Sequence, residues 1–293
     1  MHFDKMQGAG NDFILLDARD QEREWEKLAV AMCDRHFGVG ADGLILALAS
    51  SEADTRMRIF NADGSEAEMC GNGMRCFARY VIERGLASPR DGLLRVETKA
   101  GVLLVRALLD DGNVSGAEVN MGQPRLRAED VPVDAAQVQA PGTVDGALRC
   151  AIVFGEFRLD VTCLSMGNPH AVAFSPDSLH DLPLGILGPL VENHKAFPQR
   201  VNFEVARPLD RRTIEARLWE RGVGETLACG TGACAVAVAA RLHGYVDDEL
   251  DVKLPGGTLH VTWDGQGEVM LSGPAAWVFS GEWPEDAAEA PSA

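Results

Sequence analysis

A cysteine motif occurs twice in this 293-residue chain and places the strongest constraint on how the chain folds. The segment MCGNGMRCFARYVIERG, residues 69–85, aligns without a gap to ACGTGACAVAVAARLHG, residues 228–244. The offset between the copies is constant at 159 residues (229 minus 70), so Cys70 aligns with Cys229. The repeat predicts one supersecondary unit present twice, each copy opening on a cysteine.

The length of the chain fits two domains, because about 150 residues per domain is a common size. The repeat falls once in each half, which favours the same division. We predict an N-terminal domain from residues 1–120 together with 275–284, and a C-terminal domain from residues 121–274. Residues 285–293, EDAAEAPSA, are expected to form a disordered tail.

Each copy of the motif is followed by a helical pattern. Phe77, Ala78, Val81 and Ile82 make an apolar stripe, whereas residues 233–240 are apolar all round. A helix that is apolar on every side must be enclosed. The remaining sequence consists mainly of short apolar runs separated by turn residues, which indicates antiparallel strands. We therefore expect an α/β fold of the α+β type with two pseudo-symmetric domains, each a mostly antiparallel sheet or barrel wrapped round a central helix.

Local patterns add five expectations. Residues 24–35 are predicted to form a helix, and residues 93–121 three strands with turns at 99–101 and 110–113. The stretch 123–147 is rich in Pro, Ala, Asp and Gln and is expected to form a linker or a long surface connection between the halves. A turn is expected at 208–210. The last strand, residues 275–283, is expected to return to the first domain.

Composition excludes several classes of partner. A net charge of −17 argues against nucleic acid and anionic membranes, since phosphate binding depends on clustered Lys and Arg. No run approaches the roughly 18 apolar residues of a membrane span, and the N-terminus lacks the pattern of a signal peptide. We expect a cytoplasmic protein with a small-molecule substrate. The sequence leaves the oligomeric state open and is compatible with a homodimer.

The two aligned cysteines are predicted to stand at helix N-termini. Such a position offers unpaired N–H groups and a partial positive charge, which hold an anion and favour thiolate over thiol. A thiolate and a thiol on opposite faces of a carbon atom are able to invert a stereocentre as base and acid without a cofactor. The other cysteines are expected to be buried packing residues, namely Cys33, Cys76, Cys150, Cys163 and Cys234.

Two other interpretations use the same residues. The spacings C-x5-C and C-x4-C are compatible with zinc, but the intervening residues are helical and the tight pairs of a structural zinc site are missing, so no metal is expected. GTGACA, residues 230–235, matches the dinucleotide fingerprint G-x-G-x-x-G/A. The preceding stretch does not resemble a buried parallel strand, so this match is weak.

Six separated segments, in the expected order, resemble the diaminopimelate epimerase family. They are KMQGAGNDF (5–13), GVGADG (38–43), FNADGSEAEMCGNGMRC (60–76), MGNPH (166–170), RVNFE (200–204) and WERGVGETLACGTGACA (219–235). The resemblance implies a pyridoxal-independent epimerase that interconverts LL- and meso-diaminopimelate on the path to lysine and, in bacteria, peptidoglycan. It also implies two pseudo-symmetric α/β domains and no cofactor.

The resemblance assigns roles to individual residues. Cys70 and Cys229 carry the catalytic thiols, and Gly71, Asn72, Gly230 and Thr231 bind the reacting carboxylate. His170 supports the catalytic pair. The positions implied to hold the substrate's amino and distal groups are Asn11, Asn61, Asn168, Asn202, Glu220 and Arg221.

Plainer roles remain open for some of these residues. Asn11 and Asn61 stand beside Gly or Asp and are also suited to capping turns, and His170 is also compatible with a structural role. Gly43 stands where many family members have Gln, so a side-chain contact to the substrate is expected to be absent or replaced by backbone. Rival functions are a proline racemase, an isomerase of this fold that lacks the cysteines, a nucleotide-binding oxidoreductase and a non-catalytic binding protein.

Overall fold

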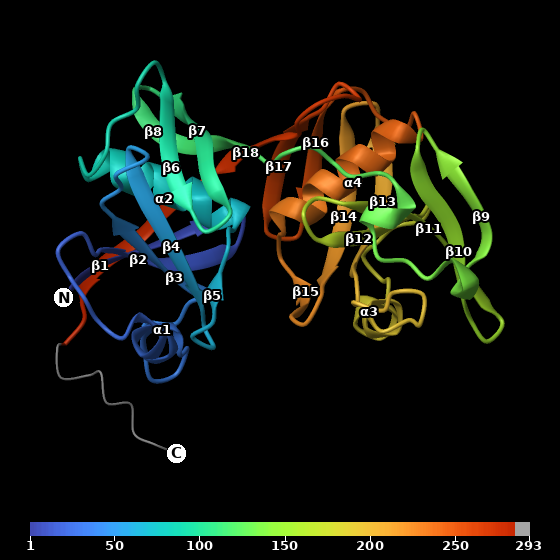
Figure 1. Ribbon diagram of the computed structural model, residues 1–293, viewed down its shortest axis with the longest axis horizontal. Coiled ribbons are helices and arrows are strands. Elements are labelled where there is room, and N and C mark those ends of the chain that lie inside the picture. Colours follow the sequence, from blue (N-terminus) through green and yellow to red (C-terminus); the bar gives the residue numbers. More distant parts are fainter. Residues whose placement is uncertain (285–293) are drawn as a thin grey trace. The chain divides into compact units, whose positions relative to one another are not determined.

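The computed structural model describes residues 1–284, and the predicted tail at 285–293 lies outside them. The chain divides into two compact units, one formed by Met1–Asn120 with the segment from Ser272, the other by Met121–Leu271. The chain therefore leaves unit 1 after Asn120 and returns at Ser272, three residues before the return expected from the sequence. Figure 1 shows a helix lying among the strands of each unit.

The described part of unit 1 contains two helices, α1 (Trp25–Cys33) and α2 (Gly71–Glu83). Its strands are β1 (His2–Gly8), β2 (Asn11–Asp17), β3 (Gly43–Leu48), β4 (Thr55–Asn61), β5 (Glu66–Ala67), β6 (Leu93–Thr98), β7 (Gly101–Asp110), β8 (Asn113–Asn120) and β19 (Ala276–Glu282). Most neighbouring strands are antiparallel, but β2 pairs with β3 and β4 with β6 in parallel.

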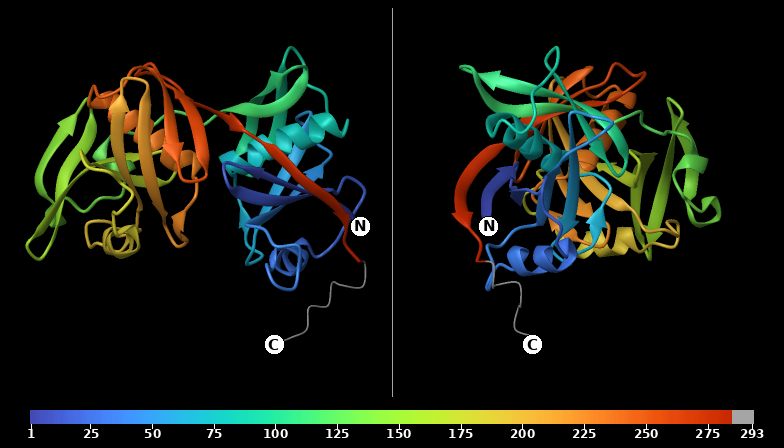
Figure 2. Two further views of the ribbon diagram at one scale, coloured as in Figure 1. Left: turned by 180° about the vertical axis from the view of Figure 1, so that it is seen from behind. Right: turned by 60° about the vertical axis from the view of Figure 1, so that its left-hand side comes forward.

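The last strand of the described chain returns to the first. Figure 2 shows β19 beside β1, and the two pair antiparallel from His2 opposite Glu282 to Gln7 opposite Ala276. The predicted return of the final strand to the first domain is confirmed.

Unit 2 contains α3 (Leu184–Glu192), α4 (Gly230–Leu242) and two short 3₁₀ helices at Ala128–Asp130 and Ala135–Gln137. Its strands are β9 (Gln139–Val144), β10 (Ala147–Phe154), β11 (Phe157–Ser165), β12 (Pro169–Phe174), β13 (Asn202–Asp210), β14 (Thr213–Glu220), β15 (Gly224–Thr226), β16 (Glu249–Leu254) and β17 (Gly257–Thr262). A further strand, β18 (Met270–Pro274), contains the boundary between the units.

The strand pairing of unit 1 recurs in unit 2. The parallel pair β2 and β3 corresponds to the parallel pair β12 and β13, and β4 with β6 corresponds to β14 with β16. In both units the strand before the cysteine, β5 or β15, is short and pairs antiparallel. Helices α2 and α4 differ by the offset of 159 at both ends. The repeat in the sequence is therefore a repeat in topology.

Both central helices are buried as their residue patterns predict. In α2, Met74, Phe77, Ala78 and Val81 are fully buried, while in α4 every residue from Gly232 to Ala240 is buried. Burying a side chain as large as Phe77 contributes about 2–3 kcal/mol. The helix N-termini are thereby held fixed, which positions the cysteines.

Each outer helix covers a separate hydrophobic core. Trp25, Leu28 and Met32 of α1 pack with Ile14 and Leu44 of the sheet in unit 1. Leu184 and Val191 of α3 pack with Phe203 and other buried residues of unit 2. The helix predicted at 24–35 is confirmed over Trp25–Cys33.

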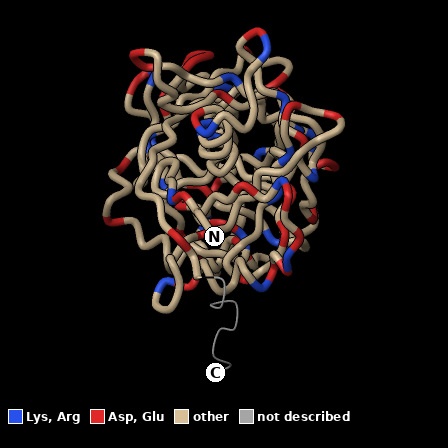
Figure 3. The backbone as a smooth tube through the Cα atoms, turned by 90° about the vertical axis from the view of Figure 1, so that its left-hand side faces the viewer, with Lys and Arg blue, Asp and Glu red and all other residues tan. Residues whose placement is uncertain are grey.

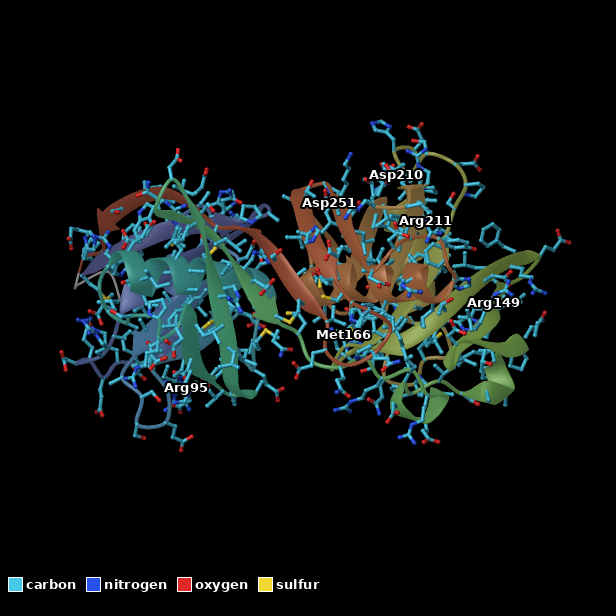
Figure 4. All side chains as sticks on the ribbon, turned by 90° about the horizontal axis from the view of Figure 1, so that it is seen from above. Arg95, Arg149, Met166, Asp210, Arg211 and Asp251 are labelled. Carbon is cyan, nitrogen blue, oxygen red and sulfur yellow. The ribbon has the colours of Figure 1, made fainter. Side chains whose placement is uncertain are left out.

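Two local expectations were wrong. The stretch 123–147 lies inside unit 2, as the predicted domain bounds imply, but it is more than a linker or surface connection because it contains β9, which pairs with β10. Five of the six residues of β9 are exposed, so this strand has the composition of a linker. The turn expected at 208–210 falls at Arg211 and Arg212, just beyond Asp210 at the end of β13 (Figure 4). Pro208 is accommodated because β12 pairs with β13 only as far as Ala206, so the missing N–H costs no bond on that side.

Acidic and basic positions are interspersed along the backbone on the side shown in Figure 3. Many acidic and basic side chains of both units are paired at the surface, for example Arg19 with Asp17 in unit 1 and Arg211 with Asp247 in unit 2. Within residues 1–284, no helix has the length and apolar character needed to cross a bilayer.

Candidate active site

Cys70 stands at the N-terminus of α2, as predicted. It is the N-cap residue, with extended backbone angles, and its Sγ accepts a hydrogen bond from the N–H of Gly73 at 3.5 Å. The thiol is partly exposed, whereas Gly71, Asn72 and Gly73 behind it are buried. The helix N-terminus therefore presents a sulfur atom and backbone donors together, a setting suited to an anion.

Asn11 and Asn72 flank Cys70. Oδ1 of Asn11 lies 3.8 Å from Sγ of Cys70 and accepts a hydrogen bond from Nδ2 of Asn72 at 3.3 Å. Asn11 contacts the cysteine across 59 positions of sequence, so its side chain does more than cap a local turn.

A network of charges holds Asn11. Its Nδ2 donates to Oδ2 of Asp42 at 2.5 Å, and Arg35 bridges Asp42 and Asp12. Nζ of Lys5 lies 2.6 Å from Asp12. Burial opposes ionisation of Asp12, but hydrogen bonds from Arg35 and Lys5 outweigh it and lower its pKa to about 2. Asp42 thus accepts from Asn11 inside a rigid ion-pair network.

Cys229 takes the equivalent place at the N-terminus of α4 and is more deeply buried, with 8% of its surface exposed. Its Sγ lies 3.4 Å from Oγ1 of Thr231. Burial raises the pKa of the Cys229 thiol well above its ordinary value, and the negative charge of Glu220 raises it further, while the Thr231 hydroxyl lowers it. The surroundings of this thiol therefore contain opposing influences on its ionisation.

A row of hydrogen bonds leads from Thr231 into the core of unit 2. Nδ2 of Asn168 donates to Oγ1 of Thr231 at 3.3 Å, and Oδ1 of Asn168 lies 2.9 Å from Nε2 of His170. Nδ1 of His170 lies 2.7 Å from Oε1 of Glu204. His170 and Glu204 are both fully buried, with at most 1% of either exposed.

Glu204 was not expected from the sequence as a site residue. Burial raises its pKa, although the neighbouring His170 opposes that shift. The available signal was an acidic residue inside VNFEVA, a run otherwise suited to a buried strand. All of the first five residues of β13 are buried, including Glu204.

The remaining site residues of unit 2 lie on β13, β14 and the turn after β14. Nδ2 of Asn202 donates to the Pro169 carbonyl, and its Oδ1 accepts from the N–H of Arg221, both at 2.9 Å. Glu220 accepts from Oγ1 of Thr226 at 2.6 Å. The guanidinium of Arg221 donates to the Gln199 carbonyl at 3.0 Å through Nη1. Asn202 thereby fixes the turn that carries the acid and the guanidinium.

Two positions of unit 1 singled out from the sequence, Asn61 and Gly43, behave differently from the rest. Asn61 hydrogen-bonds the backbone and hydroxyl of Ser65, which closes a turn, and its binding role stays a prediction. Gly43 lies on β3, where an added Cβ atom would stand 2.8 Å from the Phe60 carbonyl. Backbone fills this place, so a larger residue there requires the strands to shift.

The surroundings of Cys70 and of Cys229 are built to one plan. Phe13 pairs with Gly43 and His170 pairs with Asn202, and Gly43 and Asn202 are separated by the repeat offset. Asn11 and Asn168 each lie two residues before these strand positions, and Asn72 aligns with Thr231. In each unit an asparagine at a strand start therefore contacts the second residue of the cysteine-bearing helix.

Two observations bear on the alternative interpretations of the motif as a zinc site or a dinucleotide site. Within residues 1–284, no three His, Cys, Asp or Glu side chains gather as a set of metal ligands would. The strand before α4 is β15, which has three residues and pairs antiparallel with β14, whereas a dinucleotide site of the βαβ type needs a parallel strand.

The burial expected for the other cysteines is confirmed. Cys33, Cys76, Cys150, Cys163 and Cys234 are each at most 2% exposed. Burial raises the pKa of Cys33 and of Cys76 to about 12, so these thiols stay protonated at neutral pH.

Comparison with known proteins supplies a family context. The sequence model of the family described as diaminopimelate epimerase matches residues 3–127 and 162–278. A protein of Pelotomaculum thermopropionicum named diaminopimelate epimerase is 48% identical over 287 residues, covering 97% of this chain and 99% of that protein.

Solved structures share the fold. A PhzF-family phenazine biosynthesis protein of Bacillus anthracis superposes with a TM-score of 0.66 at 18% identity, covering 97% of this chain and 99% of that one. A probable proline racemase of Agrobacterium radiobacter K84 gives a TM-score of 0.66 at 14% identity, covering 97% and 93%. The predicted fold class is confirmed.

Proposed function

This chain belongs to the diaminopimelate epimerase family and is an amino-acid epimerase, and we propose that it interconverts LL- and meso-diaminopimelate by a two-base reaction with no cofactor. The proposed reaction supplies meso-diaminopimelate for lysine and peptidoglycan precursor synthesis.

One observation carries the proposal. Each unit presents a thiol at the N-terminus of its central helix, and an asparagine from an equivalent strand contacts the start of that helix. A single acid–base group requires one such arrangement. Two such arrangements, one in each unit, support a reaction in which one thiol acts on each face of the same carbon atom.

The proton inventory balances without an oxidant or a carrier. A thiolate removes the α-proton from one face and becomes a thiol, while the thiol of the other cysteine gives its proton to the opposite face and becomes a thiolate. The two cysteines exchange states in each turnover, and the reverse reaction restores them. Negative charge that develops on the substrate carboxylate is stabilised by N–H groups at the helix N-termini.

The polar residues take complementary roles in the proposal. Gly71 and Asn72 with Gly230 and Thr231 hold the reacting carboxylate. The planar guanidinium of Arg221 suits the distal carboxylate, and the carboxylate of Glu220 suits an ammonium group. Asn11, Asn61, Asn168 and Asn202 supply amide contacts to the substrate, and His170 supports the catalytic pair.

The test is hydrogen exchange in deuterated water. The purified protein is incubated with LL-diaminopimelate without pyridoxal phosphate or nicotinamide, and both deuterium at the α-carbon and the isomer ratio are followed. We expect both exchange and epimerisation. L-Proline in a parallel reaction should show neither, and exchange confined to proline would point to the racemase instead. Absence of exchange and epimerisation with diaminopimelate would overturn the proposal.

A further inference from the structure

Glu204 is a buried acid to which the reaction above gives no task. Its Oε1 lies 2.7 Å from Nδ1 of His170, and its Oε2 is buried without a hydrogen-bond partner among residues 1–284. Removing a carboxylate from water is costly when its oxygens are incompletely paired. The repeat shows that the fold itself does not require this residue, because the equivalent position in unit 1 is the buried Ile45 and the equivalent of His170 is Phe13.

The contacts of His170 fix where its hydrogens lie. Nε2 faces Oδ1 of Asn168, an amide oxygen that only accepts, so Nε2 carries a hydrogen. The remaining proton of the pair lies between Nδ1 and Oε1 of Glu204. Whichever of those two atoms holds it, Nε2 remains a donor. The buried acid therefore sets the direction of the hydrogen bond that His170 makes on its other side.

The hydrogen-bond direction set at His170 continues through Asn168 and Thr231 to Sγ of Cys229. Asn168 receives at Oδ1 and donates from Nδ2 to Oγ1 of Thr231, which leaves the Thr231 hydrogen available to Sγ of Cys229 at 3.4 Å. We propose that Glu204 is a positioning residue that, through His170 and Asn168, orients the Thr231 hydroxyl to donate to Cys229 and so stabilises its thiolate. This rests on the proposed role of Cys229 as an acid and base.

The charges around Cys229 explain why such a donor matters. Burial and the carboxylate of Glu220 on β14 both oppose ionisation of the thiol. The other titratable group close to Glu204 is Cys163 on β11, which is itself fully buried. The titratable residues of β16 and β17 that flank α4, such as Asp251 (Figure 4) and His260, are exposed. Ionisation of Cys229 therefore depends on the few donors that reach it.

Unit 1 has the opposite arrangement at Cys70. Asn11 donates to Asp42 and presents its amide oxygen, an acceptor, toward Cys70. In unit 2, by contrast, the hydrogen bonds that start at Glu204 end with a donor at Cys229. Cys70 consequently serves as an internal control for any treatment that acts only on the row from Glu204.

The experiment measures the thiols rather than turnover. Wild type and Glu204→Gln are treated with iodoacetamide at pH 8, and alkylation of Cys229 and Cys70 is followed by tandem mass spectrometry. The glutamine side chain accepts from Nδ1 as readily as it donates, so it no longer fixes the direction. We expect Cys229 alkylation to slow about three- to tenfold, a rise of about half to one unit in its apparent pKa, with Cys70 unchanged.

A double-mutant comparison separates positioning from general damage. In the Thr231→Val background the last donor is gone, so Glu204→Gln should have no further effect on Cys229. An unchanged Cys229 rate in the single variant, or an equal loss in the Thr231→Val background, would overturn the proposal. Because alkylation needs no substrate, either result stands whether or not the protein epimerises diaminopimelate.

A measurement on the wild-type protein covers the case in which Glu204→Gln does not fold. In protein labelled with ¹⁵N-histidine, His170 should show a hydrogen on Nε2 at every pH between 6 and 9. An unprotonated Nε2 in this range would contradict the direction of the row and with it the role of Glu204.

Discussion

Asn11 and Asn168 occupy equivalent positions in the two units but present opposite ends of their amides to the cysteine-bearing helix. Asn11 accepts from Asn72 through Oδ1, whereas Asn168 donates to Thr231 through Nδ2. Asp42 fixes the first amide and His170 fixes the second. The surroundings of the two cysteines are thus matched in backbone and thiol but opposite in hydrogen-bond direction.

The fixing of Asn11 by Asp42 leads to a mutational prediction. Asp42→Ala removes the acceptor and frees the Asn11 amide to turn, so kcat/KM for LL-diaminopimelate should fall about tenfold, the size expected for one hydrogen bond to a charged group. Arg35→Gln is the matched control, because it removes the ion pair to Asp42 but leaves the Asn11 bond. Steady-state kinetics measure kcat/KM for LL-diaminopimelate in both variants. Equal losses of kcat/KM would contradict the role given to Asp42.

Two glycines of α3 allow a controlled test of packing beside the site. A Cβ atom at Gly188 would lie 2.2 Å from the Trp219 ring, whereas nothing lies within 4 Å of one at Gly185. Gly185→Ala should raise stability by up to about 1 kcal/mol through helix propensity. Gly188→Ala should instead lower it by about 1–3 kcal/mol, since Trp219 must move. Thermal unfolding of the two variants measures the difference, and equal shifts would refute the packing at Trp219.

The buried thiols predict a loss of stability in alkali. Burial raises the pKa of Cys33 and Cys76 from 9.0 to about 12, so between these values the native protein binds protons that the unfolded chain has released. The free energy of unfolding should therefore fall as pH rises above 9, by up to about 1.4 kcal/mol per pH unit for each thiol. Urea unfolding from pH 8 to 10 tests this. Cys76→Ala should show a shallower fall, and a slope identical to wild type would count against the effect.

Arg221 is predicted to select the distal carboxylate of the substrate. Arg221→Lys keeps the positive charge but loses the planar, two-point grip, so KM should rise about tenfold with a smaller change in kcat. The backbone N–H of residue 221 still bonds Asn202, which keeps the turn in place. An unchanged KM would remove Arg221 from the binding site.

The sequence was sufficient to predict the parts of the fold that follow from repetition and periodicity. The helix starts at Cys70 and Cys229 and the burial of Cys76 and Cys234 followed from the residue pattern. The return of the last strand to the first unit followed from its place after the second copy, whereas its partner β1 was not predicted. Helix α3 was not predicted, because its apolar pattern is interrupted by residues that disfavour a helix, namely Gly185, Gly188 and Pro189. Strand β9 was missed because an exposed edge strand lacks the alternation of a buried one.

The same distinction applies to the candidate site residues: those inside the repeated motif were predicted from it, and Glu204 and Asp42, which lie outside it, were not. Residues within the repeated motif were predicted because two copies reinforce each other, and their roles in binding and catalysis stay predictions. Glu204 and Asp42 were missed because each acts through a second residue, His170 or Asn11, that lies more than 30 positions away in the sequence. Only folding brings such partners together, and neither acid has a distinctive spacing from the cysteines.

The most direct test of the two-thiol account is a single-turnover experiment in deuterated water with Cys70→Ser, Cys229→Ser and the matched control Cys234→Ala. Cys234 lies on α4 but is fully buried, so its loss should leave inversion of LL-diaminopimelate near the wild-type rate. Each serine variant should lose inversion by several orders of magnitude, because a hydroxyl is a far weaker acid than a thiol. Inversion at the wild-type rate in either serine variant would contradict the account.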